Sequence, residues 1–308
     1  MRLTLAARPD ARMNHAHYNR ALPNTSHLDR LTVVLVSPRN PLNIGAAARA
    51  MANFGFSRLA VVAPYQAHWR EAKSAVGAPD LLRNAGESET LAAAVADCTL
   101  VAGTASLTHR KPKQPVISLP DLRPIIRSEL ARGGRTALVF GSEKRGLSRE
   151  DLAHCHLLVT IPTDARQPSM NLAQAVAVCL YELSLRLASD ASDPGAPDPG
   201  SRRTGPRPWG GDPASGTWET TSANSLPPAT SRDLDLLAEL IAQTMAAANY
   251  PPAIMRSANR HDVHLLLRRL ALSGRDARRI LGLFRRILWR LQDVPKRSNQ
   301  SSTNVPHK

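Results

Sequence analysis

Short apolar, β-branched runs alternate with helical stretches along the first 187 residues, and this alternation is the strongest constraint on the fold. The predicted strands are Thr32–Val36, Leu59–Ala63, Thr99–Ala102, Ala137–Phe140 and Leu157–Ile161. The predicted helices are Ile44–Phe54, Ser88–Ala96, Leu122–Arg132, Ser148–Ala153 and Asn171–Leu187. Such alternation favours a mostly parallel sheet covered by helices on both faces, so we predict one α/β domain over residues 31–187.

The chain changes character after this domain. Residues 188–230 are rich in Pro, Gly and small polar residues, which bury too little apolar area to offset the entropy of ordering, so we predict a flexible linker. Residues 231–293 combine helical periodicity with many arginines and predict a small helical extension. Three interpretations of its basic face stay open: a solvated surface, an RNA contact and a subunit contact. The termini, 1–30 and 294–308, are predicted to be disordered tails.

The charge balance favours a polyanionic partner. The chain has 40 Lys and Arg residues against 25 Asp and Glu, a formal net charge of +15. Nucleic acid is the commonest partner of such a chain. The alternative explanation is an Arg-rich composition that reflects a GC-rich genome. Since no apolar run approaches the roughly 18–20 residues of a membrane span, no membrane association is predicted.

The cysteines indicate a reducing compartment. Cys98, Cys155 and Cys179 have no C-x-x-C spacing, which argues against a disulfide framework or a zinc site and favours a cytoplasmic location. The sequence His154-Cys155-His156 resembles a metal cluster. However, adjacent side chains of an extended segment point to opposite faces, so we predict no metal there.

Three polar corners follow or precede the predicted elements and indicate a ligand site, because ligands of α/β sheets bind at the carboxyl ends of strands. The first corner contains Asn43, Gly45 and Arg49. Asn43 is either a helix cap or a site residue, and Gly45 allows close approach of a backbone or ligand. Arg49 lies among small apolar residues and needs a partner, which is either an internal carboxylate or a bound anion.

The second and third corners lie around residues 140–147 and 169–172. The segment Gly141–Gly146 lacks the Gly-Lys-Ser/Thr ending of a phosphate loop, and no G-x-G-x-x-G follows a strand. Glu143 is the only carboxylate on this bend, where it caps the turn, pairs with a neighbouring base or serves a site. Ser169 is either an ordinary helix N-cap or, together with Asn171, a wall of the same pocket.

These corners resemble the motifs of a known family. The segments Asn43-x-Gly45-x-x-x-Arg49, Phe140-Gly141-x-Glu143-x-x-Gly146-Leu147 and Ser169-Met170-Asn171-Leu172-Ala173 resemble the three motifs of the SpoU/TrmH (SPOUT) RNA ribose 2′-O-methyltransferases. The resemblance covers residues 31–187, and the helical tail is similar to that of the TrmJ-like branch. The basic residues expected soon after the Gly-Thr pair in that branch are replaced here by Leu107 and His109.

The resemblance implies an α/β fold with a C-terminal trefoil knot, a homodimer, and S-adenosyl-L-methionine (SAM) as the cofactor. The implied cofactor contacts are Thr104, Ala105, Ser106, Gly141, Ile161, Pro168, Ser169 and Met170. The implied catalytic or site-shaping residues are Asn43, Arg49, Glu143, Ser169 and Asn171. The implied substrate is RNA, most directly a cytidine or uridine ribose of a tRNA anticodon loop, and DNA should be inert because it lacks the 2′-hydroxyl.

We hypothesise that Arg49 stabilises the developing alkoxide, because a guanidinium does not deprotonate readily enough to act as a base. Three alternatives stay open: an rRNA 2′-O-methyltransferase, a non-catalytic RNA-binding protein on the same fold, and a nucleotide-dependent enzyme of another kind. The missing phosphate-loop lysine argues against the last of these.

Overall fold

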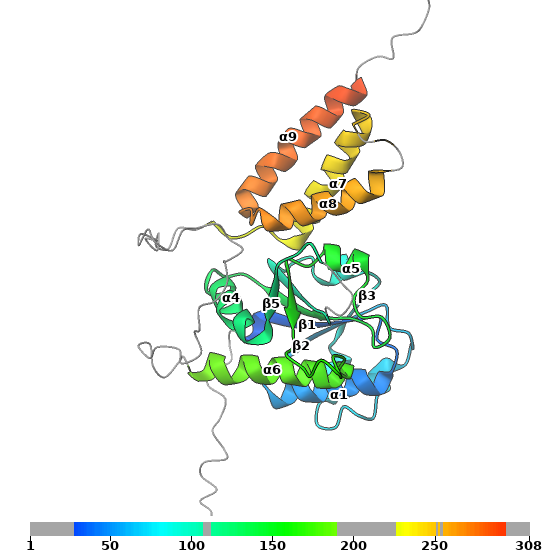
Figure 1. The fold of residues 1–308 in the computed structure, drawn as a ribbon, viewed down its shortest axis with the longest axis vertical. Helices are drawn as coiled ribbons and strands as arrows, with labels where there is room; N and C mark the ends of the chain where they lie inside the picture. Colours follow the sequence, from blue (N-terminus) through cyan, green and yellow to red (C-terminus); the bar gives the residue numbers. More distant parts are fainter. Residues whose placement is uncertain (1–27, 107–111, 190–225, 251, 253–254, 294–308) are drawn as a thin grey trace, which may run out of the picture.

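The computed structural model describes residues 28–106, 112–189, 226–250, 252 and 255–293. Most of the predicted tails and linker, as well as Leu107 and His109, lie outside these residues. The described chain forms an α/β domain (residues 28–189) and a helical extension (residues 226–293), which is stacked on one end of that domain (Figure 1). Leu28–Arg30, which we predicted to belong to a disordered tail, form a 3₁₀ turn with Leu28 buried, so the domain begins slightly earlier.

The α/β domain contains a seven-stranded sheet whose strand pairs are all parallel in the described residues, which confirms the predicted parallel arrangement and adds two strands to the five predicted. Its spatial order is β3-β2-β1-β6-β4-β7-β5. The strands are β1 (Leu31–Val36), β2 (Arg58–Val62), β3 (Gly86–Ser88), β4 (Leu100–Thr104), β5 (Val116–Ser118), β6 (Thr136–Phe140) and β7 (Leu157–Thr160). The helices of this domain are α1 (Pro41–Asn53), α2 (Pro79–Arg83), α3 (Leu91–Ala94), α4 (Leu119–Ala131), α5 (Arg149–Ala153) and α6 (Leu172–Ser189).

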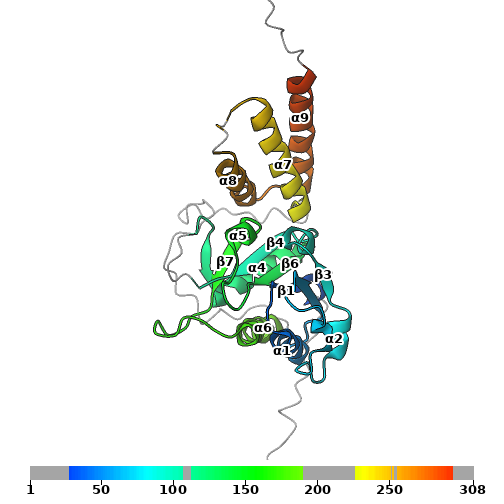
Figure 2. The ribbon, with the colours of Figure 1, turned by 90° about the vertical axis from the view of Figure 1, so that its right-hand side faces the viewer.

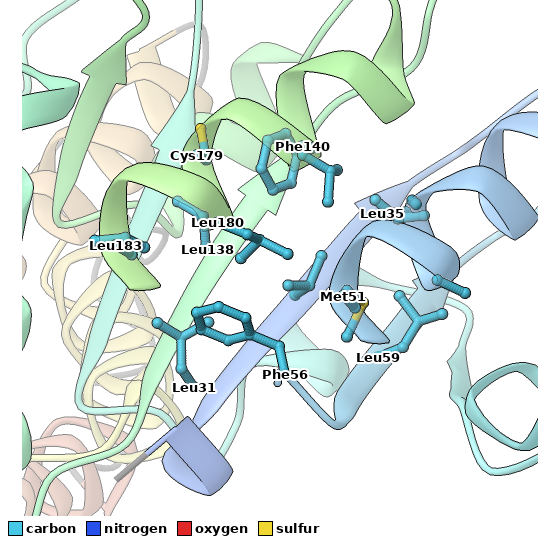
Figure 3. Packing of buried hydrophobic residues seen from close by; sticks show 14 of the residues in the cluster. Leu31, Leu35, Met51, Phe56, Leu59, Leu138, Phe140, Cys179, Leu180 and Leu183 are labelled. Atoms are coloured by element: carbon cyan, nitrogen blue, oxygen red, sulfur yellow. The ribbon is translucent and has the colours of Figure 1, made fainter. Parts of the chain in front are cut away.

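Alternate residues of the central strands enter two separate cores, which explains why these strands are apolar throughout. Leu31, Val33 and Leu35 of β1 pack into the core beneath α1, α4 and α6. Val34 and Val36 pack into the core covered by α3 and α5. Figure 3 shows the first core, where side chains of β1, β6, α1 and α6 meet. Helices therefore cover both faces of the sheet, as predicted.

The sequence-based prediction was wrong at Ser88–Ala96, which was expected to be a single helix. Gly86–Ser88 instead forms the edge strand β3. The helix α3 is confined to Leu91–Ala94, and the Thr90 side chain accepts a hydrogen bond from the Ala93 N–H at its start. The polar residues before Leu91 are suited to an exposed edge and a helix cap.

The helical extension contains α7 (Ser231–Ala247), α8 (Arg256–Arg269) and α9 (Gly274–Asp293), which share a small apolar core. It contacts the α/β domain where Ser231 N–H donates to the Cys98 carbonyl at 2.8 Å and Arg232 N–H donates to the Ala96 carbonyl at 3.0 Å. Both views place the extension on the opposite side of the α/β domain from α1 and α6 (Figures 1 and 2). No helix in the described ranges is long and apolar enough to cross a membrane.

Candidate active site

Glu143 connects the first two polar corners. Its Oε2 accepts a hydrogen bond from the Arg39 N–H at 2.8 Å. Its Oε1 accepts from the Asn40 N–H at 3.2 Å and from the Asn43 side-chain amide at 2.8 Å. β1 and β6 are neighbours in the sheet, so the loop after β6 can reach the start of α1. Two segments about a hundred residues apart are therefore held together by one carboxylate.

Asn171 connects the third corner to the same network. Its side-chain amide donates to Asn43 Oδ1 at 3.0 Å. Its own Oδ1 accepts from the Ala173 N–H at 2.9 Å, at the start of α6. All three sequence corners thus meet in one chain of hydrogen bonds, from Glu143 through Asn43 to Asn171. We call this chain the corner network.

The corner network keeps Glu143 ionised. Partial burial alone would raise the pKa of Glu143, but the hydrogen bonds from Asn43 and from backbone N–H groups outweigh it and lower the pKa below its ordinary value. Because both oxygens accept N–H groups, Glu143 is a structural acceptor rather than a base available to a substrate. It therefore shapes the site by joining its loops.

The helix caps differ from those expected. Asn40, rather than Asn43, caps α1, with its Oδ1 accepting from the Leu42 N–H at 2.9 Å. Asn171, rather than Ser169, supplies the side-chain acceptor at the start of α6. Ser169 is exposed in the irregular segment before that helix. Asn43 is consequently free to act in the corner network, within the first turn of α1.

Two glycines allow close backbone approach. A Cβ atom on Gly141 would lie 2.1 Å from the Gly146 carbonyl carbon and 2.2 Å from the Leu147 nitrogen, so the bend closes tightly on itself. Gly146 N–H donates to the Ser142 carbonyl at 2.8 Å. A Cβ atom on Gly45 would lie 2.3 Å from Ser74 Oγ. The close approach that Gly45 allows is therefore to Ser74 of the same chain.

The implied cofactor residues follow three strands that are adjacent in the sheet, namely β6, β4 and β7. Gly141 follows β6, Thr104 ends β4, and Ile161 follows β7. Thr104 Oγ1 donates to the Val139 carbonyl at 3.0 Å, and Ala105 N–H donates to the Val159 carbonyl at 3.0 Å, so the strand ends are tied together. The other implied contacts lie on the continuations of these loops: Ser106 after β4, and Pro168, Ser169 and Met170 before α6.

Arg49 does not join the corner network. It lies six residues after Asn43, about 240° further round α1, and it is exposed. The expectation that Arg49 is buried among small apolar residues was wrong, because those residues point inward while Arg49 shares the outer face with Leu42, which is 54% exposed. No partner for Arg49 is found among the described residues.

A basic cleft of about 1110 Å³ lies beside the corner network. It is lined by residues that follow β1, β2 and β6, by α5, and by His261 of α8. Ala105 is the one implied cofactor residue in this lining. The cleft therefore adjoins the loops that carry the implied cofactor residues rather than coinciding with them.

A polar cluster that no sequence pattern indicated lies between the α/β domain and the extension. The Arg268 side chain is 1% exposed and donates from Nη2 to Asp235 Oδ1 at 2.6 Å. His154 and His264 each place Nδ1 3.3 Å from an Asp235 oxygen. Burial would raise the pKa of Asp235, but hydrogen bonds from the two histidines and the charge of Arg268 outweigh it and lower the pKa.

His154 thus lies in a cluster with two metal-type ligands, although His156 does not. The guanidinium of Arg268 already supplies the positive charge that balances Asp235. His156 instead accepts a hydrogen bond at Nδ1 from the Val101 N–H at 3.1 Å, and burial lowers its pKa to about 3. Periodicity within each segment could not reveal this cluster, because its members come from the end of α5 and from α7 and α8.

Together, the parallel sheet and the three loops joined at its carboxyl edge define an α/β protein with a candidate ligand site built from loops. Residues 30–181 match the SpoU rRNA Methylase family. The chain belongs to this family, because it also covers 74% of a tRNA/rRNA methyltransferase of Escherichia coli (strain K12) at 36% identity.

Relatives were found in several bacteria. The chain is 41% identical over 159 residues to the tRNA (cytidine/uridine/adenosine-2′-O-)-methyltransferase TrmJ of Pseudomonas aeruginosa (strain UCBPP-PA14), a match that covers 51% of this chain and 62% of the relative. It is 36% identical over 171 residues to the uncharacterized tRNA/rRNA methyltransferase LasT of Escherichia coli (strain K12), covering 55% of this chain and 74% of the relative. The chain thus spans less than two thirds of the first of these relatives.

Among solved structures, the crystal structure of TrmJ from Z. mobilis ZM4 is similar, with a TM-score of 0.65 and 25% identity. The match covers 83% of this chain and 98% of that chain. Because residues 28–189 are only about half of the chain, coverage this large includes residues beyond the α/β domain.

Proposed function

We propose that the chain is a SAM-dependent RNA ribose 2′-O-methyltransferase. The observation that carries this proposal is the corner network, in which Glu143, Asn43 and Asn171 join all three family motifs at one edge of the sheet. The names of the P. aeruginosa and E. coli relatives support the reaction class.

The loops after β4, β6 and β7 fit the proposed cofactor. Their adjacent strand ends offer half-buried apolar side chains at Ala105, Ile161 and Met170, together with backbone groups that suit an adenine and a thioether chain. Bound SAM would supply an electrophilic methyl group. We propose that residues 161–171 belong to the trefoil knot that the family resemblance implies.

The proposed chemistry is an in-line attack of the ribose O2′ on the methyl carbon. The O2′–CH₃ bond forms while the S–CH₃ bond breaks, and the hydroxyl proton passes to water or to a phosphate oxygen. The chain's part is alignment and charge stabilisation. We assign charge stabilisation to Arg49 and loop positioning to Asn43, Glu143 and Asn171, with Ser169 as a wall of the site.

We propose that the active form is a homodimer that uses the outer face of α1 and α6. This face exposes Leu42, Val178 and Tyr181, which are large apolar side chains, and it also carries Arg49. The Tyr181 ring contacts Phe54 edge-on, with the ring centroids 5.8 Å apart, so the two helices present one surface. Pairing two copies here would bring Arg49 out of bulk solvent.

We propose tRNA as the substrate, specifically a cytidine or uridine ribose of the anticodon loop. The names of the TrmJ relatives support tRNA and these two nucleosides, and the family resemblance of the motifs implies the anticodon loop. A cytoplasmic location also stays a prediction.

The test is transfer of label from methyl-labelled SAM to tRNA, rRNA and a DNA of the tRNA sequence, alongside calorimetry of SAM binding. We expect SAM binding and label in tRNA only. SAM binding without transfer to any RNA would favour a non-catalytic RNA-binding protein. Label in rRNA alone would favour the rRNA alternative.

A further inference from the structure

Two neighbouring strands end in the same unusual way. β1 ends at Val36 and β2 at Val62, and these residues are partners in the parallel ladder. The following residues, Ser37 and Ala63, have left-handed backbones with φ of 47° and 43°. Residues with a side chain rarely adopt this conformation, and it is enriched where backbone strain serves a site. Each of these two residues is followed by a proline, Pro38 after Ser37 and Pro64 after Ala63.

These matched turns place Arg39 and Tyr65 together. The Arg39 guanidinium carbon lies 4.7 Å from the centroid of the Tyr65 ring. The Tyr65 N–H donates to the Pro38 carbonyl at 3.1 Å, and the Arg39 N–H donates to Glu143 Oε2 at 2.8 Å. The backbones of both residues are therefore held in place, and the pair is bonded directly to the corner network.

Tyr65 is 70% exposed, so core packing does not explain its position. Both Tyr65 and Arg39 line the basic cleft. Asp151 is the single carboxylate of that lining, and it is engaged in the capping box of α5. The other basic or imidazole side chains of the lining are Lys113, Lys144, Arg145, Arg149 and His261.

We propose that the stacked Arg39–Tyr65 pair is a preformed platform for an unpaired base of the substrate RNA. The identity of the ligand rests on the proposed function. An unpaired base stacks on aromatic rings and on guanidinium planes, while nearby lysines and arginines bind the phosphates of the RNA backbone. Because stacking tolerates any base, the platform positions a nucleotide beside the modified one and does not select its identity.

The experiment measures binding of unmodified tRNA to the full-length chain by fluorescence anisotropy over a range of salt concentrations. The variants are Tyr65→Ala and Tyr65→Phe, with circular dichroism to confirm folding. We expect Tyr65→Ala to weaken binding about tenfold or more and Tyr65→Phe to bind within about twofold of the unaltered chain. The dependence of affinity on salt should not change, since neither variant removes a charge.

A contrast variant, Lys144→Ala, should instead make affinity less dependent on salt. Undiminished binding by folded Tyr65→Ala would overturn the platform, and so would an equal loss in Tyr65→Phe or an absence of tRNA binding by the unaltered chain. Tyr65-dependent tRNA binding without methyl transfer would uphold the platform and contradict the proposed function alone.

Discussion

Glu143 holds together the loops of the candidate site, and we propose that it does so without taking part in the chemistry. Its carboxylate accepts hydrogen bonds from Arg39, Asn40 and Asn43, all on the turn into α1. A glutamine at this position would replace one acceptor oxygen by an NH₂ group, which cannot accept hydrogen bonds from these N–H donors. Losing these hydrogen bonds would shift the loops, and we expect the shift to impair the proposed catalysis.

We predict that Glu143→Gln lowers the free energy of unfolding by about 1 kcal/mol and reduces methyl transfer strongly. Urea unfolding and a transfer assay check both effects. Glu89→Gln, at an exposed position, is the matched control and should change neither. An active, fully stable Glu143→Gln variant would show that the carboxylate is dispensable.

The same residue predicts a dependence on pH. The pKa of Glu143 is lower in the folded chain than its ordinary value of 4.5. Ionised Glu143 therefore stabilises the fold above that value, and this contribution is lost as the pH falls through the folded-state pKa. The stability advantage of the unaltered chain over Glu143→Gln should shrink below about pH 4.5. An advantage that stays constant down to pH 3 would contradict this reading.

Arg49 is the residue to which we assign transition-state stabilisation. We predict that Arg49→Ala lowers methyl transfer by orders of magnitude, whereas calorimetry shows SAM affinity within about threefold of the unaltered chain. Arg49→Lys should recover part of the activity because it restores charge without the planar fork. Full activity in Arg49→Ala would remove this residue from the chemistry.

The sequence predicted that Asn43, Glu143 and Asn171 belong to one site, because each follows or precedes an element of a parallel sheet. It left open that Glu143 caps a turn but did not predict that the backbone donors belong to Arg39 and Asn40 of another loop, since these donors carry no side-chain signature. The solvent exposure of Arg49 was also missed, because the small apolar residues around it are neighbours in sequence but not on the helix surface.

At the scale of elements, the bend after β6 depends on the absence of a side chain at Gly141. Its Cα faces the backbone of Gly146 and Leu147, which cannot move away as a flexible side chain would. The bend also carries Glu143, so its shape sets the geometry of the corner network.

We predict that Gly141→Ala destabilises the chain and abolishes methyl transfer, because a Cβ would lie within 2.2 Å of backbone atoms. Gly282→Ala is the control, since nothing lies within 4 Å of a Cβ there and an alanine favours the helix α9 by about 1 kcal/mol. Thermal unfolding should show opposite shifts. Equal shifts of both variants would contradict the tight closure of the bend.

The central strands of the sheet were predictable, whereas the edge strands and one short helix were not. β1, β2, β4, β6 and β7 were expected to within two residues, because burial on both faces leaves apolar runs. The three-residue strands β3 and β5 were missed, since edge strands that are partly exposed carry no continuous apolar pattern. Helix α2, a single short turn of five residues, was also missed.

At the scale of the molecule, a buried ion pair within the extension lies against the α/β domain, because Asp235 and Arg268 both contact His154 of that domain. Arg268 was expected to lie on a basic helix face, yet its side chain is buried against Asp235, beside His154 of the α/β domain. Pattern analysis of a single helix cannot show this, because the partner belongs to a different helix.

We predict that Asp235→Asn destabilises the chain by about 3–5 kcal/mol, because it leaves the Arg268 charge buried without an anion. The double variant Asp235→Asn/Arg268→Leu should be less destabilised than the sum of the two single variants, as a double-mutant cycle in urea will measure. The exposed pair of Glu239 and Arg260 is the control, and Glu239→Gln should cost less than about 1 kcal/mol. Strict additivity would show that Asp235 and Arg268 do not act as a unit.

The central claim is that this chain methylates a ribose hydroxyl of RNA. The most direct measurement is mass spectrometry of nucleosides from unmodified tRNA that has been incubated with the full-length chain and SAM. We expect a 2′-O-methylated nucleoside, which should be absent when either the chain or SAM is omitted. A methyl group on a base, or no methylated nucleoside from a preparation that binds both SAM and tRNA, would contradict it.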